Sequence, residues 1–176
     1  MPRGDPSGPP GRAEPGPSDA AAVARDRFGR EHPNVLLQAF AIQNLSRELL
    51  QRAFADLALD PREWGVLSVL RAFGPQTPSA LAAFLGMAPT TLSSWIARLS
   101  RRQLVRKRRN PADGRSYLLE VSARGEVLIQ RAGPSFQRAL ERLNSELGEQ
   151  RADVLDAQAL LTEALRRALS DSTHSQ

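Results

Sequence analysis

Apolar residues recur at helical spacing along most of the chain, and breaks in this pattern divide it into elements. From Pro33 to Leu59 the apolar positions drift around the helix instead of following one narrow stripe. A helix that is apolar on more than one side must bury more than one side. We therefore expect this segment to pack both on its own domain and on a second copy of the chain.

Two shorter helices are each predicted by a capping residue followed by proline. Asp60-Pro61 begins a helix that should run to Phe73, and Thr77-Pro78 begins one that should run to Leu85. Gly86 follows the second helix, where a tight turn between helices favours a residue with positive φ. The inward positions of the first of these helices are Trp64, Leu67 and Leu70.

A third helix is predicted from Pro89 to about Arg102, and its two faces differ in character. One face is an apolar seam formed by Leu92, Ile96 and Leu99. The other is small, hydroxylic and basic, and lacks the Glu–Lys pairs typical of a solvated helix face. Short polar side chains let a helix enter a DNA major groove, where hydroxyl and guanidinium groups reach base edges and phosphates. The residues of this face are Thr90, Ser93, Ser94, Ala97, Arg98 and Arg101.

A basic hairpin follows this helix. Residues 104–108 and 116–121 alternate well enough to be strands, and the intervening Asn110-Pro111-Ala112-Asp113-Gly114 is a dense cluster of turn residues. A run of cations can simply aid solubility, but a run of one sign next to two turn-linked helices favours contact with phosphates. The cations presented by the hairpin are Arg106, Lys107, Arg108, Arg109 and Arg115.

The remaining residues predict two further helices. Ser122 can cap a helix that continues towards Leu147, although Gly133-Pro134 should kink or break it. Gly148 separates it from a last amphipathic helix. The apolar face of that helix comprises Val154, Leu161, Leu165 and Leu169. The predicted fold class is therefore mainly α with a small β-wing.

The positive charge of the chain is local. Between Arg98 and Arg115 lie eight cationic residues and one acid, a net charge of +7 against +5 for the whole chain. A local basic stripe is the electrostatic footprint of a polyanionic partner. We therefore expect double-stranded DNA to bind the third helix and the hairpin.

Composition excludes several other classes of protein. The chain has no cysteine, which excludes disulfides, thiolate zinc sites and sensing by thiol oxidation. Its two histidines, His32 and His174, lie in the flanking segments, so neither is placed for a catalytic triad or a metal site. No Gly-rich phosphate loop occurs. We expect no enzymatic activity, no cofactor and no metal.

The two ends differ from the middle. Residues 1–30 are rich in proline and glycine and poor in apolar residues, so we expect a disordered tail. A solvated tail is favoured over a DNA-contacting arm, for which the available cations are Arg3, Arg12, Arg25, Arg27 and Arg30. Residues 171–176 should form a second flexible tail. With no signal peptide and no apolar run of about 18 residues, the sequence predicts a cytoplasmic protein without membrane contact.

From about Pro33 to Leu169 the order of elements resembles that of the MarR family of bacterial transcriptional regulators. The resemblance rests on Thr77–Leu85, Met87–Leu99, Leu104-Val105-Arg106 and Asn110–Arg115. It implies a winged helix-turn-helix domain over residues 31–170. The DNA-binding lobe would be residues 61–121, and the dimerisation helices would be residues 33–59 and 123–169.

The sequence departs from the family's pattern at a few positions, none of which removes a DNA-contacting charge. Ala88 stands where a capping serine is usual, and Gln103 replaces a common glycine. Gly114 precedes Arg115 where the family often has a second arginine or a neighbouring acid. Val121-Ser122 replaces the usual Leu-Thr.

The resemblance also implies residue roles. Thr90, Ser93, Ser94 and Arg98 would lie in or beside the major groove, Arg115 would enter the flanking minor groove, and Asp113 would hold the wing arginines in place. The family function implied is that of a homodimeric, sequence-specific repressor. The alternative is an architectural winged-helix protein with little sequence preference, since arginine-rich wings serve both.

A ligand is the last implication of the resemblance. Many members bind a small aromatic or anionic effector between the dimerisation helices and the DNA-binding lobe. The candidates in this sequence are Gln38, Asn44, Trp64 and Arg71. Core packing is the competing role for Trp64, and a surface ion pair is the competing role for Arg71.

Overall fold

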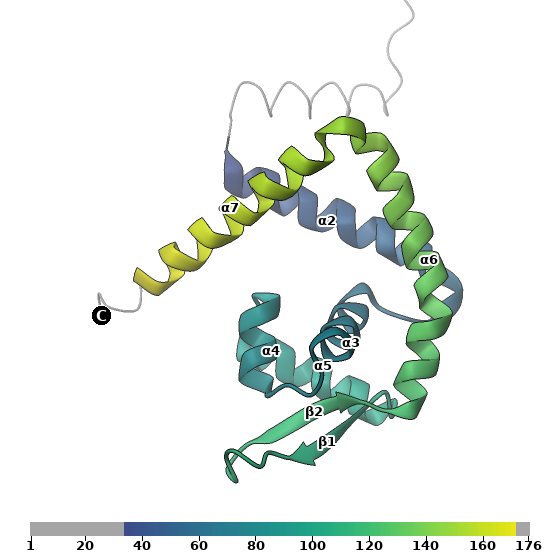
Figure 1. Ribbon diagram of the computed structural model, residues 1–176, viewed down its shortest axis with the longest axis vertical. Helices are drawn as coiled ribbons and strands as arrows, with labels where there is room; N and C mark the ends of the chain where they lie inside the picture. Colours follow the sequence, from purple (N-terminus) through teal and green to yellow (C-terminus); the bar gives the residue numbers. More distant parts are fainter. Residues whose placement is uncertain (1–33, 172–176) are drawn as a thin grey trace, which may run out of the picture. The chain divides into compact units, whose positions relative to one another are not determined.

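The computed structural model describes residues 34–171 (Figure 1). The tail predicted over residues 1–30 lies outside the described residues. Residues 172–176 of the predicted C-terminal tail also lie outside them. The chain divides into two units, residues 1–45 and residues 46–176.

Helix α2 (Val35–Ala53) forms the described part of the first unit and continues into the second. The side chain of Asn34 begins it by accepting hydrogen bonds from the backbone N–H groups of Leu36 and Leu37, at 3.0 and 3.3 Å. The helix ends before the predicted limit at Leu59. A short 3₁₀ turn, η1 (Ala55–Leu57), replaces its last part, and Ala58 then adopts a left-handed φ of 47°.

Helices α3 (Pro61–Phe73) and α4 (Pro78–Leu85) have the predicted bounds. Asp60 caps α3 and Thr77 caps α4, and both helices carry proline in their first turn. Gly86 ends α4 with φ 61°, as a left-handed C-cap. Trp64, Leu67 and Leu70 are buried, as predicted.

Helix α5 (Pro89–Arg101) leads into an antiparallel hairpin of β1 (Val105–Arg109) and β2 (Tyr117–Val121). Each strand begins one residue later than predicted. Gln76, before α4, pairs with Leu119 of β2 through two backbone hydrogen bonds of 3.0 and 2.8 Å, and so ties the hairpin to the helices. The core of the second unit includes Leu67, Leu81, Leu92, Leu99 and Leu119, each at most 1% exposed.

Helix α6 (Ala123–Leu147) is one continuous helix with Pro134 inside it. The sequence predicts a kink or a break at Gly133-Pro134. The break is therefore wrong, and the kink stays a prediction. Proline in a helix crowds both the carbonyl group four residues back and the Cβ of the residue before it. Gly133 has no Cβ, which removes the second of these clashes. Ser122 caps the helix as predicted, since its Oγ accepts a hydrogen bond from the Gly125 N–H at 3.0 Å. Gly148, with φ 54°, and η2 (Gly148–Gln150) then lead into α7 (Arg151–Asp171).

The start of α6 is packed closely against the start of the hairpin. A Cβ placed on Gly125 would lie 2.2 Å from the carbonyl oxygen of Leu104 and 2.7 Å from Cγ1 of Val121. Only glycine allows the helix to approach the hairpin backbone this closely. This contact holds the basic hairpin against α6.

Candidate nucleic-acid interface

The two faces of α5 are separated as the sequence predicts. Leu92, Ile96 and Leu99 are at most 4% exposed and fix one face against the core. The opposite face is exposed and consists of Thr90, Ser93, Ser94, Ala97, Arg98 and Arg101. Ala88 occupies the N-cap position and makes no side-chain capping hydrogen bond, as its replacement of serine leads one to expect. The side chains of the exposed face are small or polar, which suits a helix that enters a DNA groove.

The hydroxyl groups of this face are not equivalent. Ser94 Oγ donates a hydrogen bond of 2.7 Å to the carbonyl oxygen of Thr91, which fixes its rotamer and leaves its lone pairs outward. No hydrogen bond of the Thr90 or Ser93 hydroxyl occurs within residues 34–171. Both hydroxyls can therefore donate to or accept from an external partner.

Arg98, predicted at the major groove, is engaged inside the protein. Its Nε lies 3.0 Å from Oε1 of Glu63, and its guanidinium carbon lies 5.3 Å from the centre of the Trp95 ring. About half of its side chain stays exposed. Arg98 thus anchors α5 to α3 while presenting one edge outward.

The partner of Arg98 is a buried carboxylate. Glu63 is 0% exposed and also pairs with Arg102, whose Nη1 donates to Oε2. The same Oε2 accepts the backbone N–H of Asp60 at 3.3 Å, which completes a capping box at the start of α3. One carboxylate therefore joins the first turn of α3 to the last turns of α5. We call Glu63, Arg98 and Arg102 the glutamate clamp.

Glu63 was not among the residues that sequence reasoning selected. The signal was present, because Asp60 and Glu63 have the three-residue spacing of a capping box. That spacing predicts the local contact with Asp60 but not the two arginines, which lie 35 and 39 positions further along the chain.

The hairpin arginines also differ in their surroundings. Arg106 Nε lies 2.6 Å from Oε1 of Glu120 on the neighbouring strand, and Arg108 Nη1 lies 4.0 Å from Oε2. The Lys107 ammonium lies 4.5 Å above the ring of Tyr117. Arg109 and Arg115 are exposed, and neither has a carboxylate within 4.0 Å in the described part of the chain. These two are the most available wing cations.

The wing tip is held by its own turn. The Asp113 carboxylate accepts the backbone N–H of Arg115 at 3.0 Å, while Asn110 Nδ2 donates to Ser116 Oγ at 2.7 Å. The sequence prediction was that Asp113 supports the wing arginines. The observed support acts on the backbone of Arg115 and leaves its guanidinium free to point outward.

A second feature is a crevice of about 600 Å³ between α3 and α6. Trp64 and Phe136 form its aromatic wall, with ring centres 5.1 Å apart. Ser68 Oγ faces this region buried and without a hydrogen-bond partner. Arg71 is half-exposed at the edge of the crevice, where its Nε lies 3.9 Å from Oε2 of Glu126. We call it the α3–α6 crevice.

The four predicted ligand residues fall into two groups. Trp64 and Arg71 both line the α3–α6 crevice. Each also has the competing role, since Trp64 is buried in the core and Arg71 forms an ion pair with Glu126. Gln38 and Asn44 are exposed residues of α2 in the first unit. The residues that line the crevice all belong to the second unit, so the roles of Gln38 and Asn44 stay predictions.

Two comparisons of sequence agree with this geometry. A sequence profile of the MarR family matches residues 59–117, which span α3 to the first residue of β2. A helix-turn-helix transcriptional regulator from Mycobacterium tuberculosis is 30% identical over 128 residues, which cover 72% of this chain and 88% of that protein.

Solved structures have the same fold. The transcriptional repressor CouR, bound to a 23-mer DNA duplex, is 25% identical with a TM-score of 0.66, over 78% of this chain and 96% of that one. The PcaV transcriptional regulator from Streptomyces coelicolor, in complex with its natural ligand, is 24% identical with a TM-score of 0.59. That match covers 82% of this chain and 96% of PcaV.

Proposed function

Because this chain belongs to the MarR family of transcriptional regulators, we propose that it is a dimeric, sequence-specific repressor that a small ligand releases from its operator. The observation that carries this proposal is the exposed face of α5. It combines free hydroxyls with arginines, and its buried face and the glutamate clamp hold it rigidly. A rigid helix with short polar side chains is suited to reading base edges.

The wing supplies the second contact. Arg115 at its tip would enter the minor groove, where a narrow A·T-rich segment concentrates negative potential. Arg101 and Arg109, both exposed, would contact phosphates, which position the protein without specifying sequence. CouR, solved on a DNA duplex with this fold, is consistent with such docking.

The DNA-binding experiment is selection of sites from a random duplex pool at near-physiological salt. We expect an inverted repeat whose half-sites lie about 10–10.5 bp apart, because a two-fold dimer reads one face of the duplex. DNA binding without an enriched motif would favour the architectural function instead. Absence of any binding would contradict both.

A second copy of the chain would cover the apolar residues of α2 and α7. In the first unit, exposed apolar side chains follow much of the first half of α2: Val35, Leu36, Leu37, Phe40, Ile42 and Leu45, all 47–64% exposed. In the second unit, α7 exposes Leu155 by 53% and Leu160 by 70%. Apolar exposure on this scale is unusual for a monomer and typical of an association surface.

Phe40→Glu tests the dimer. A carboxylate in an apolar interface costs several kcal/mol, so we expect a shift to monomer in analytical ultracentrifugation and a loss of operator binding. Gln51→Glu, an exposed position on the same helix, adds the same charge and should leave the dimer intact. An unchanged sedimentation coefficient for Phe40→Glu would exclude the first half of α2 from the interface.

The α3–α6 crevice is our proposed effector site. An aromatic acid could place its ring against Trp64, its carboxylate near Arg71, and a polar atom near the unpaired Ser68 hydroxyl. Each of these groups is then satisfied, as buried polar groups require. An effector releases DNA only if it binds the DNA-free conformation more tightly than the DNA-bound one.

Salicylate is a suitable probe for this site. The chain has two tryptophans, so Trp95→Phe leaves Trp64 as the single indole, and its fluorescence should respond to salicylate. Salicylate should also raise the melting temperature and weaken operator binding. Arg71→Gln should reduce all three effects, whereas a full response in that variant would place the ligand elsewhere.

A further inference from the structure

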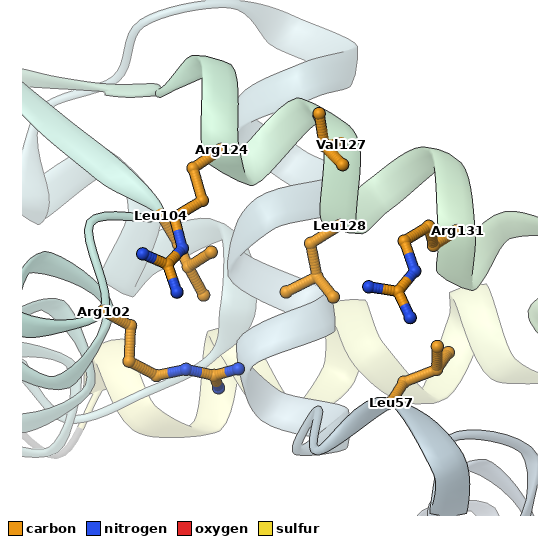
Figure 2. Close-up of a pocket in the computed structure, with 7 residues that line it drawn as sticks. All are labelled: Leu57, Arg102, Leu104, Arg124, Val127, Leu128 and Arg131. Carbon is orange, nitrogen blue, oxygen red and sulfur yellow. The ribbon is translucent and has the colours of Figure 1, made fainter.

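Three arginine side chains line a cavity that shares no residue with the α3–α6 crevice. It has a volume of about 270 Å³ and lies among η1, the segment between α5 and β1, and the first turns of α6 (Figure 2). Its apolar residues are Leu57, Leu104, Val127 and Leu128, and its cations are Arg102, Arg124 and Arg131. We call it the arginine cavity.

The positive charge of the arginine cavity is poorly neutralised. Arg124 and Arg131 lie seven residues apart on one face of α6, and no carboxylate lies within 4.0 Å of either within residues 34–171. Arg102 pairs with Glu63, but Glu63 also pairs with Arg98. Three guanidinium groups therefore share at most part of one carboxylate. Arg124 and Arg131 are exposed, so water screens part of their charge, and an anion in the cavity would meet three guanidinium donors.

Arg102 can bind an anion without leaving the glutamate clamp. Its Nη1 donates to Glu63, while its Nε and Nη2 have no partner among the described residues. A guanidinium has five N–H donors in a planar fork, so one edge can serve Glu63 and another a ligand. Figure 2 shows the Arg102 and Arg131 side chains extending towards the space beside Leu128.

The rest of the cavity is aliphatic. Val127 is 56% exposed at its edge, and Leu57 and Leu128 are partly buried. Covering this surface with an apolar group would be favourable. The volume is slightly below the range usual for ligand pockets, which restricts the occupant to a small molecule. An anionic head and a short apolar body fit these surroundings together.

We propose that the arginine cavity binds a small organic anion whose carboxylate or phosphate head contacts the three guanidinium groups. A short apolar body covers the leucines and Val127. Because Arg102 belongs to both the cavity and the glutamate clamp, the bound anion is linked through Glu63 to the position of α5. This is a second ligand site, distinct from the α3–α6 crevice.

Isothermal titration calorimetry on the full-length protein tests the site with four probes. Hexanoate and hexyl phosphate carry both features, and the stronger binder of the two identifies the preferred head group. Inorganic phosphate has no apolar body and 1-hexanol has no charge, so each should bind about tenfold or more weakly than the better amphiphile. The titration uses no DNA, so its result does not depend on the proposed repressor function.

Variants locate the binding. The double variant with Arg124→Gln and Arg131→Gln should bind hexanoate or hexyl phosphate about tenfold or more weakly than the wild type, since two charge-assisted contacts are lost. Arg47→Gln with Arg151→Gln removes the same charge at exposed positions outside the cavity and should bind as the wild type does. Arg71→Gln, in the α3–α6 crevice, should also bind normally.

Four results would overturn the proposal. The wild type could bind neither amphiphile, or the cavity variant could bind both as tightly as the wild type. An equal loss of affinity in the Arg47/Arg151 control would mean that net charge alone determines the binding. A loss confined to Arg71→Gln would assign the ligand to the crevice.

Discussion

At the scale of single residues, Glu63 connects two helices through one carboxylate. It caps α3 through Asp60 and pairs with Arg98 of α5 and with Arg102, the C-cap residue of that helix, although it is fully buried. A buried carboxylate is costly unless it is paired and hydrogen-bonded. Oε2 of Glu63 is both, whereas Oε1 has the ion pair with Arg98 but no hydrogen-bond partner among the described residues. Here the pairing fixes the helix that carries the proposed base-reading residues. Arg98 is therefore best regarded as a positioning residue with one exposed edge.

Glu63→Gln should lower the free energy of unfolding by about 2 kcal/mol. Glutamine keeps the volume and can still accept the capping hydrogen bond, so the loss is that of the negative charge facing Arg98 and Arg102. The partial exposure of both arginines keeps the loss below that of a fully buried pair. Urea unfolding measures it.

Glu126→Gln is the matched control, because Glu126 is 3.9 Å from Arg71 with both side chains more than 40% exposed. It should change stability by less than about 0.5 kcal/mol. Equal effects of the two substitutions would mean that the glutamate clamp contributes no more than a surface ion pair.

Arg115→Ala should weaken operator binding by roughly 1–3 kcal/mol without changing folding or dimerisation, because its guanidinium is exposed at the wing tip. Fluorescence anisotropy with the selected operator measures the change. Arg151→Ala, exposed at the start of α7, is the control for loss of one charge. Wild-type affinity in Arg115→Ala would rule out the minor-groove contact.

At the scale of elements, the hairpin and α6 depend on one close backbone approach. Gly125 allows α6 to begin directly against the Leu104 carbonyl. The Ser122 hydroxyl stabilises the same junction by donating a hydrogen bond of 2.6 Å to the carbonyl oxygen of Gln103. Gln103 itself adopts a left-handed φ of 58°, which explains why glycine is the common residue there.

Gly125→Ala should lower the free energy of unfolding by about 3 kcal/mol, because the added methyl group meets backbone that cannot move aside cheaply. Gly65→Ala in α3 should instead raise it by about 0.5–1 kcal/mol, since the nearest atom to the added Cβ is Cδ2 of Leu85 at 3.9 Å, an ordinary contact, and alanine favours helix. Thermal and urea unfolding of the two variants compare them directly. Similar stability of both would contradict the close approach.

At the scale of the whole molecule, the distribution of charge decides how the protein meets DNA. Between Arg98 and Arg115 the sequence has eight cations, but Glu63 and Glu120, both outside that window, pair with four of them. The remaining four are Arg101, Lys107, Arg109 and Arg115, and these are free to contact phosphates. Counting these two carboxylates lowers the net charge of the interface from +7 to +5, and it leaves four cations without a carboxylate partner among the described residues.

The salt dependence of operator binding measures this difference. With four phosphate-contacting cations in each protomer of a dimer, the slope of log Kobs against log salt should be about −7. If all eight cations of each protomer contacted phosphates, the slope would be about −14. The steeper value would mean that the paired arginines leave their carboxylates on DNA, and a slope near zero would contradict phosphate contact.

No single helix within residues 34–171 is long and apolar enough to cross a membrane. The pair α4 and α5 reaches the required length only together, across a bend of 114°.

The sequence by itself determined the features that depend on neighbouring residues. Caps at Asp60, Thr77 and Ser122 set helix starts, and Gly86 and Gly148 set helix ends, because these signals act over one turn. The same holds for the two faces of α5. The continuity of α6 through Pro134 could not be predicted in this way, because the missing Cβ of Gly133 removes one clash while the lost hydrogen bond and the clash with the Gln130 carbonyl remain.

Only the tertiary structure decided which charges remain available. Glu63 meets Arg102 across 39 residues, Glu120 meets Arg106 through strand register, and the arginine cavity joins η1 to α6. No periodicity in the sequence encodes such contacts, because they depend on how distant elements pack. Composition therefore gives the number of cations, whereas the fold determines which of them are neutralised and which can bind a partner.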